Sequence, residues 1–339
     1  MKKVFVALLI LIAGAHVWAA PLLINGAGAT FPYPIYSKWF DEYSKANPDI
    51  QMNYQSIGSG GGIKQISSHT VDFGASDGPM TDAQLQKAEG QLLHFPTVLG
   101  GVVPIYNVDG VVTSLKFSQE AMAKIFLGQV TLWSDPLIKK DNPSVHLPAT
   151  SITVVHRADG SGTTYCWTDF LSKISAEWKN RVGKANSVNW PVGLGGKGNE
   201  GVAGLIKQTP NSIGYVELIY ATQNKLDYGA LENKAGKFIL CSNASVSAAA
   251  ANAAKNMPRD FRVSITNAEG NESYPASTFT WLLIYRRQSD GAKGKALVDF
   301  LDWMLTKGQT YADDLGYAPL PANVIPMEKD AIKLIEIKG

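Results

Sequence analysis

Short apolar runs rich in β-branched and aromatic residues alternate with amphipathic segments of helical period along almost the whole chain of 339 residues. This alternation predicts an α/β fold, because buried strands need helices to cover them. The expected strands are Gln51–Ser56, Val71–Ala75, Val98–Tyr106, Ser151–Val155, Ser212–Val216 and Phe279–Tyr285. The expected helices are Pro34–Ala46, Gly62–Ser68, Gln119–Phe126, Thr163–Lys173, Gly201–Thr209, Ser245–Lys255 and Ala292–Thr306. The length favours two lobes over one.

The first 19 residues have the pattern of a secretory signal peptide. Lys2 and Lys3 precede an apolar run from Val4 to Ala13, and the small residue Ala19 precedes a proline at position 21. The apolar run is shorter than a comfortable membrane span. The sequence therefore predicts cleavage after Ala19 and an exported, soluble mature chain.

The charge of the chain is balanced, with 31 basic and 29 acidic residues. Because the expected leader carries two of the lysines, the formal charge of residues 20–339 is zero. Such a balance argues against a nucleic-acid partner. Any binding of an anion must then depend on a local arrangement of dipoles and a few charges.

Two cysteines, Cys166 and Cys241, lie in a chain that the leader directs to an oxidising compartment. A single disulfide between them is one expectation. Two separate buried thiols are the other, because free cysteine is among the most buried residue types. The spacing does not decide between them.

The most specific motif is RADGSGTT, which begins at Arg157, between a predicted strand and a predicted helix. The first N–H groups of a helix have no partners within the helix, so they suit an anion. Arg157 offers a forked donor to a tetrahedral anion. Ser161 and Thr163 add hydroxyls, and Gly162 adds a backbone N–H that can approach a ligand closely. Asp159 either pairs with Arg157 and orients it or simply caps the helix.

A run of small residues, NGAGATFP, begins at Asn25 and leads into a helix whose first turn contains Pro32 and Pro34. Proline is tolerated there because its missing N–H would have had no partner. We expect a turn, after which Thr30 offers its hydroxyl and Phe31 its backbone N–H to a ligand. An ordinary N-cap and turn would produce the same pattern.

A glycine-rich run, IGSGGGIK, begins at Ile57, follows a predicted strand and opens a predicted helix. Ser59 is placed either as the N-cap or as a donor to a ligand. The run is not a Walker A motif, because Ile63 stands where that motif has glycine before Lys64, so nucleotide binding is not supported. A loop selected only for tight packing is the alternative.

The run VDFGASDGP predicts a short strand that ends at Asp77, where ligand-contacting residues of α/β proteins usually lie. A carboxylate suits an anion only if the anion carries a proton. Mono- and dibasic phosphate keep at least one P–OH, whereas sulfate at neutral pH has none. A site built to bond a ligand OH rejects the analogue without it by about four to five orders of magnitude. Asp77 therefore predicts phosphate over sulfate, unless it is a plain turn aspartate.

Seven motifs together resemble the periplasmic phosphate-binding proteins of bacterial ABC-type phosphate importers. They follow one another in the family's order and extend over the whole mature chain. They are residues 26–32 (GAGATFP), 57–61 (IGSGG), 71–77 (VDFGASD), 95–97 (FPT), 157–163 (RADGSGT), 193–199 (GLGGKGN) and 213–217 (IGYVE).

The resemblance implies a two-lobed venus-flytrap fold of the type II periplasmic binding proteins, in which each lobe is a mixed β-sheet flanked by helices. Residues 20–97 and 271–339 would form the first lobe and residues 98–270 the second, with phosphate engulfed between them. The phosphate contacts that it implies are Thr30, Phe31, Ser59, Asp77, Arg157, Ser161, Gly162 and Thr163, with Asp159 holding Arg157.

The resemblance also implies delivery of phosphate to an inner-membrane ABC permease by a periplasmic protein that is no enzyme. We expect a monomer that needs no cofactor or metal. Arsenate keeps a proton as phosphate does, so the argument from Asp77 does not separate the two anions. A binder of sulfate or molybdate is the closer rival, and Asp77 argues against it.

A secreted hydrolase is the alternative from another class. The DGSG sequence around Ser161 departs from the Gly-x-Ser-x-Gly elbow, and no histidine is placed by the sequence as its base. The four histidines of the mature chain show no metal-site spacing. The run GLGGKG from Gly193 has the spacing Gly-x-Gly-x-x-Gly, but the leader and Pro191 favour loop or hinge geometry over a dinucleotide site.

Overall fold

The computed structural model describes residues 20–111 and 113–338. The expected signal peptide, residues 1–19, lies outside the described residues. The strands are β1 (Leu22–Gly28), β2 (Ile50–Ser56), β3 (Phe73–Ser76), β4 (Leu92–Asn107), β5 (Lys116–Phe117), β6 (Thr153–Arg157), β7 (Leu194–Gly196), β8 (Ser212–Glu217), β9 (Asp227–Tyr228), β10 (Ala230–Glu232), β11 (Phe238–Ile239), β12 (Ser277–Tyr285), β13 (Arg287–Gln288) and β14 (Glu336–Ile337).

The helices alternate with these strands along the chain. They are α1 (Tyr33–Ala46), α2 (Ser59–Ser67), α3 (Asp82–Lys87), α4 (Gln119–Phe126), α5 (Pro136–Asp141), α6 (Gly162–Ile174), α7 (Ala176–Arg181), α8 (Gly198–Gln208), α9 (Leu218–Gln223), α10 (Asn243–Lys255), α11 (Gly291–Leu305) and α12 (Val324–Ile332), with 3₁₀ turns at Gly308–Tyr311 and Asp313–Leu315. None of the helices in the described part of the chain has the length and apolar character that a membrane crossing requires.

The main sheet has nine strands within the described residues and mixes parallel with antiparallel pairs. Its strand order is β2-β1-β3-β12-β4-β8-β6-β7, with β9 paired to β4. β1 runs parallel to β2 and β3, and β6 runs parallel to β7 and β8. β4 is antiparallel to both β12 and β8. The predicted α/β class is confirmed.

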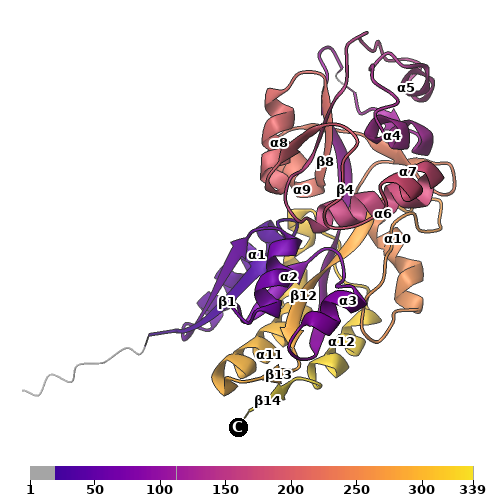
Figure 1. The fold of residues 1–339 in the computed structure, drawn as a ribbon. Helices are drawn as coiled ribbons and strands as arrows, with labels where there is room; N and C mark the ends of the chain where they lie inside the picture. Colours follow the sequence, from indigo (N-terminus) through magenta and orange to yellow (C-terminus); the bar gives the residue numbers. More distant parts are fainter. Residues whose placement is uncertain (1–19, 112, 339) are drawn as a thin grey trace, which may run out of the picture.

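β4 belongs to two groups of elements, which Figure 1 shows above and below one another. Its residues 92–101 pair with β12 in the lower group, and residues 102–107 pair with β8 in the upper group. The lower group carries α1, α2, α3, α11 and α12, and the upper group carries α4 to α9. The two groups are therefore joined by a continuous strand and not by a flexible linker.

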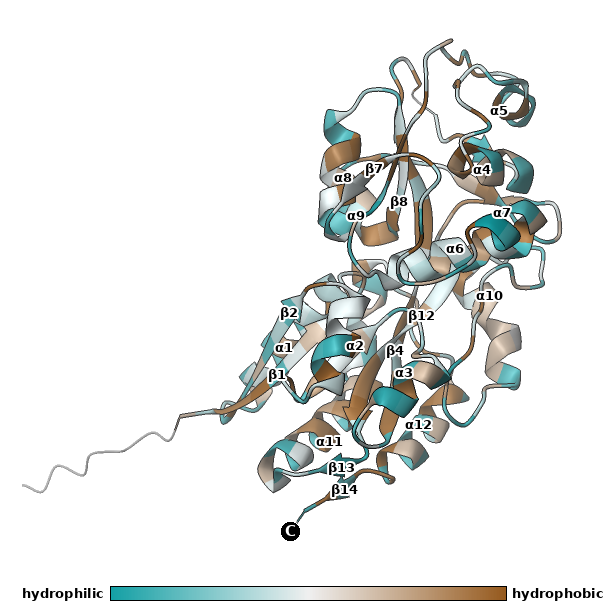
Figure 2. Ribbon diagram, in the orientation of Figure 1, coloured by the Kyte–Doolittle hydropathy of each residue, from teal (hydrophilic) through white to brown (hydrophobic). Residues whose placement is uncertain are grey.

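Apolar side chains on the strands and on the inner faces of the helices form the core. Figure 2 shows β4 and β8 as largely hydrophobic, whereas α7 is mainly hydrophilic and other helices are mixed. The largest side chains that are fully buried include Trp39, Trp133, Trp167, Trp178 and Trp281. Aromatic packing thus accounts for much of the interior of both groups.

The expected strands and helices are present, with ends shifted by a few residues. The expected turn at residues 25–28 is wrong, because these residues lie in strand β1. Small residues are needed there for close packing: a Cβ on Gly26 would lie 2.0 Å from the Phe73 ring, and one on Gly28 would lie 2.1 Å from the Ala75 carbonyl oxygen.

Cys166 and Cys241 are both free and buried, so the structure has two thiols and no bond between them. Burial raises the pKa of each thiol well above its usual range. Both side chains therefore behave as small apolar groups in the core.

Candidate functional site

The predicted anion-binding residues follow the carboxyl ends of parallel strands. Thr30 comes after β1, Ser59 after β2 and Asp77 after β3, while Arg157 is the last residue of β6. Because β1, β2 and β3 are parallel, their carboxyl ends meet at one edge of the sheet. The same holds for β6 and β7, so the two groups of strands each present one edge to the site.

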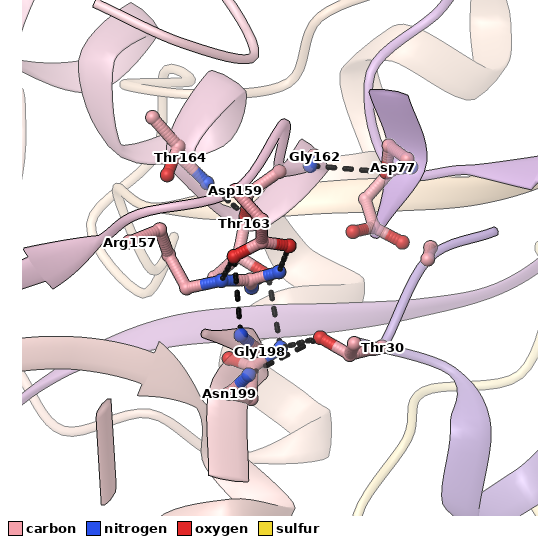
Figure 3. A network of polar contacts seen from close by, with 12 residues as sticks. Thr30, Asp77, Arg157, Asp159, Gly162, Thr163, Thr164, Gly198 and Asn199 are labelled. Carbon is pink, nitrogen blue, oxygen red and sulfur yellow. Dashed lines mark hydrogen bonds and ion pairs between the residues drawn. The ribbon is translucent and has the colours of Figure 1, made fainter. Parts of the chain in front are cut away.

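Side chains from the two groups meet directly. The Ser59 hydroxyl accepts the backbone N–H groups of Asp77 (3.2 Å) and Gly162 (3.0 Å). The backbone N–H of Gly60 donates to the Gly160 carbonyl over 2.8 Å. Figure 3 shows Thr30 and Asp77 on one side of this region and Arg157 and Thr163 on the other. The structure thus brings the predicted segments together although they are far apart in the sequence.

The predicted site residues with polar side chains are almost completely buried. The exposed fractions are 2% for Thr30, 0% for Ser59, 1% for Asp77, 3% for Arg157, 0% for Ser161 and 0% for Thr163. Burial in a protein interior strengthens every electrostatic interaction that these groups make.

Arg157 and Asp159 form a bidentate ion pair, as the sequence suggested. The guanidinium Nε donates to Oδ1 over 2.7 Å, and one terminal nitrogen donates to Oδ2 over 2.6 Å. Burial alone would raise the pKa of Asp159, but Arg157 and the Gly198 N–H together hold it below its usual range. The second terminal nitrogen lies 3.4 Å from the Thr163 hydroxyl. The pair fixes the guanidinium and neutralises much of its charge.

Asp77 is held differently. The Thr280 hydroxyl donates to its Oδ1 over 2.9 Å, and no cation bonds it directly among the described residues. Burial raises the pKa of Asp77 to about 7, although Thr280, the charge of Arg157 and Ser59 all act to lower it. The second carboxyl oxygen, Oδ2, would lie 2.6 Å from a Cβ on Gly162. A side chain at position 162 would therefore collide with the carboxyl.

Ser161 is the N-cap of α6, and its hydroxyl oxygen accepts the Thr164 N–H over 3.0 Å. A hydroxyl that accepts in this way still has its own proton to donate. The N-cap of α2 is Gly58, which has φ of +86°, and Ser59 is the first helical residue. The alternative in which Ser59 is the N-cap is thus wrong, because the N-cap position has a positive φ that glycine suits.

Phe31 is buried beside Thr30, and the Tyr317 hydroxyl donates to its carbonyl over 2.6 Å. Its side chain makes no polar contact, so only its backbone N–H is available for the predicted role. The carbonyl of Thr30 accepts from the Tyr220 hydroxyl. Both bonds come from distant residues and fix the segment that links β1 to α1.

Asn199 is a buried residue at the site that sequence reasoning missed. Its amide nitrogen donates to the hydroxyls of Thr30 (2.7 Å) and Thr163 (3.1 Å). The preceding Gly198 donates its N–H to Asp159 over 3.1 Å. The signal was present in the GLGGKGN motif, which we interpreted as loop or hinge geometry because only its glycine spacing was considered.

The described residues contain no group of three His, Cys, Asp or Glu side chains close enough to hold a metal ion. The site is instead built from hydroxyls, backbone N–H groups, one paired guanidinium and one buried carboxyl. Such a set can surround a small tetrahedral oxyanion with donors and present one acceptor to it.

Comparison with known proteins identifies the family. A sequence profile described as the PBP superfamily domain matches residues 18–307. The phosphate-binding protein PstS of Pasteurella multocida is 49% identical over 303 residues, which cover 89% of this chain and 87% of that protein. The PstS of Haemophilus influenzae is 45% identical over 325 residues, which cover 96% of each. The chain belongs to the PstS family of the PBP superfamily.

Solved structures confirm the fold that is expected of a PstS. A high-affinity periplasmic phosphate-binding protein, PfluDING, was solved with bound phosphate and has a TM-score of 0.73 to this chain at 19% identity. The match covers 91% of this chain and 93% of that one. The periplasmic-binding-protein fold predicted from the motifs is therefore confirmed.

Proposed function

We propose that this chain binds inorganic phosphate between its two groups of elements and delivers it to an inner-membrane ABC permease. The PstS relatives support phosphate as the ligand, and their family supports the permease as the partner. Within the site, one structural observation supports the proposal most strongly. A buried carboxyl, Asp77, lies among donors that favour an oxyanion.

The proposed ligand contacts combine donors with a single acceptor. Asp77 accepts a hydrogen bond from a P–OH of phosphate, and the other groups donate through hydroxyls, backbone N–H groups or the guanidinium. The contacts are Thr30, Phe31, Ser59, Asp77, Arg157, Ser161, Gly162 and Thr163, and Asp159 supports Arg157. Phosphate and arsenate keep a proton for Asp77, whereas sulfate would place an unprotonated oxygen against it. This difference makes the site selective for protonated anions.

Opening of two lobes would give phosphate access to so buried a site, and closure would then surround it. We assign residues 20–97 and 271–339 to one lobe and residues 98–270 to the other. The bonds of Ser59 with Gly162 and of Gly60 with Gly160 would then form only in the closed state. Phosphate shifts the equilibrium toward this state because it prefers the closed form.

The proposed location is the periplasm, reached through cleavage of the leader after Ala19. We further propose that the mature chain acts as a monomer and releases phosphate without chemical change. The relatives support release without chemical change, because they are named as phosphate-binding proteins.

Calorimetric titration of phosphate into phosphate-stripped protein that spans residues 20–339 tests the proposal. We expect tight binding at one site that excess sulfate leaves unchanged. Weak phosphate binding, or competition by sulfate, would contradict the proposed ligand. Arsenate in the same cell should compete with phosphate.

A further inference from the structure

Asn199 joins two hydroxyls that come from opposite sides of the site (Figure 3). Thr30 lies between β1 and α1, and Thr163 lies in the first turn of α6. The amide nitrogen of Asn199 is 2.7 Å from the first hydroxyl oxygen and 3.1 Å from the second. Asn199 is completely buried, so neither bond competes with bulk water.

The direction of these bonds is fixed by the other end of the amide. Its Oδ1 accepts the backbone N–H of Glu217 over 3.0 Å, so the amide nitrogen must face the two threonines. The backbone N–H of Glu217 can only donate. Strand β8, which ends at Glu217, therefore holds the Asn199 amide in one orientation.

Each threonine oxygen receives a second donor. The backbone N–H of Asn199 lies 3.3 Å from the Thr30 hydroxyl, and Arg157 lies 3.4 Å from the Thr163 hydroxyl. A hydroxyl has two acceptor positions and one proton. With two donors on each oxygen, the remaining proton of each hydroxyl is free to be donated elsewhere.

We propose that Asn199 is a positioning residue that makes both threonine hydroxyls donors to the bound anion. The inference rests on the proposed function, because it concerns how the same site holds phosphate. Apart from the P–OH that faces Asp77, the phosphate oxygens only accept hydrogen bonds, so a threonine hydroxyl that turned its oxygen toward them would repel the anion. Asn199 and Thr163 both belong to residues 98–270, so only the orientation of the Thr30 hydroxyl requires the two sides of the site to be together.

The test is a double-mutant cycle on phosphate affinity. Asn199→Ala should weaken phosphate binding by about tenfold to a hundredfold, the range expected for hydrogen bonds to a charged group. In a Thr30→Val, Thr163→Val background the same change should weaken binding by less than about threefold, because no hydroxyl is left to orient. An equal loss in both backgrounds would overturn the inference, since it would mean that Asn199 acts through general stability.

The matched control is Asn107→Ala, at the last residue of β4, whose amide contacts the opposite end of α8. The Asn107 amide donates to the Ile206 and Lys207 carbonyls, so this variant loses two comparable bonds away from the site. It should lower thermal stability and leave phosphate affinity unchanged within about threefold. A loss of affinity equal to that of Asn199→Ala would also overturn the inference.

Asn199→Asp keeps the shape of the side chain, and it replaces Asn199→Ala as the test variant if the alanine variant does not fold. Its carboxylate accepts where the amide donates, so both hydroxyls would turn their protons away from the ligand. We expect at least about a hundredfold weaker phosphate binding near pH 8, and binding equal to that of the unmodified chain would contradict the inference. If the unmodified chain itself bound no phosphate, the proposed function would fail, which this experiment distinguishes.

Discussion

The two acidic side chains of the site have opposite surroundings. Asp159 is paired with Arg157 through two short bonds, which hold its pKa below the usual range against the effect of burial. Asp77 is bonded by the neutral Thr280 hydroxyl, and burial raises its pKa to about 7. One carboxylate thus compensates a cation, whereas the other remains available to a ligand. The comparison teaches that the two carboxyls suit different partners, and on the proposed function Asp77 would select an anion by the proton that it carries more than by its charge.

Asp77→Asn removes the unpaired acceptor and should have the largest effect. Because Thr280 occupies Oδ1, the new amide would present N–H groups to the ligand. Sulfate can accept from these groups, so the ratio of phosphate to sulfate affinity should fall by at least about a thousandfold. Calorimetric titration with each anion measures the ratio. The control is Asp82→Asn, which breaks an ion pair between the exposed Asp82 and Arg262. This variant should leave the ratio of phosphate to sulfate affinity unchanged.

Arg157→Ala breaks the ion pair between Arg157 and Asp159. It removes donors to the anion and leaves the Asp159 carboxylate without its partner beside the site. Loss of one member of a buried charged pair costs about 2–5 kcal/mol, or roughly thirtyfold to several thousandfold in affinity. Phosphate and arsenate should weaken together, which equilibrium dialysis can measure. Retained tight binding would exclude Arg157 from the site. Adding Asp159→Asn to the variant should recover part of the loss.

Gly162→Ala tests the surroundings of Asp77 separately from those of Asp159, because it adds a methyl group beside Asp77 and leaves the charge of the site unchanged. The added Cβ would lie 2.5 Å from the Ser59 hydroxyl and 2.6 Å from Asp77 Oδ2. Overpacking of this kind costs about 1–3 kcal/mol, so phosphate affinity should fall by about fivefold to a hundredfold. Gly204→Ala is the matched control in α8, where a Cβ would meet nothing within 4 Å. Equal affinities of the two variants would contradict the close packing described here.

The pKa of Asp77 predicts a smaller effect on stability without ligand. Since the folded pKa, about 7, is above the unfolded value of 3.8, the stabilising contribution of Asp77 is full below about pH 4 and is lost as pH rises through 7. Between pH 6 and pH 7 the protein should lose about 1 kcal/mol of unfolding free energy relative to Asp77→Asn. Chemical denaturation of both proteins at the two pH values measures this difference. If both proteins lost the same unfolding free energy between pH 6 and pH 7, Asp77 would not titrate in this pH range.

Local sequence was sufficient to place residues that lie between a strand and the helix that follows it. Arg157, Ser161 and Thr163 lie within one such turn, so their joint position follows from a few residues. Asp77 could be placed from the end of its strand alone. Small residues misled us at Gly26 and Gly28, because dense packing and a turn require the same residue type.

The partners of Asn199 and Thr280 could not be found in this way. Asn199 bonds a residue 169 positions away, and Thr280 bonds a residue 203 positions away. Thr280 also lies where the register between β12 and β4 shifts, an irregularity that no local pattern announces. Such contacts arise from the order of strands in the sheet. The predicted ligand contacts therefore lie in local motifs, whereas the bonds that Asn199 and Thr280 make to Thr30 and Asp77 join distant parts of the sequence.

Competition by monofluorophosphate at about pH 8 tests the central claim most directly. This dianion has the size and charge of dibasic phosphate but no P–OH to give to Asp77 when fully ionised. The account predicts binding at least about a thousandfold weaker than that of phosphate in the same titration. Monofluorophosphate that bound within about tenfold of phosphate would contradict it, because the anion would then be selected without its proton.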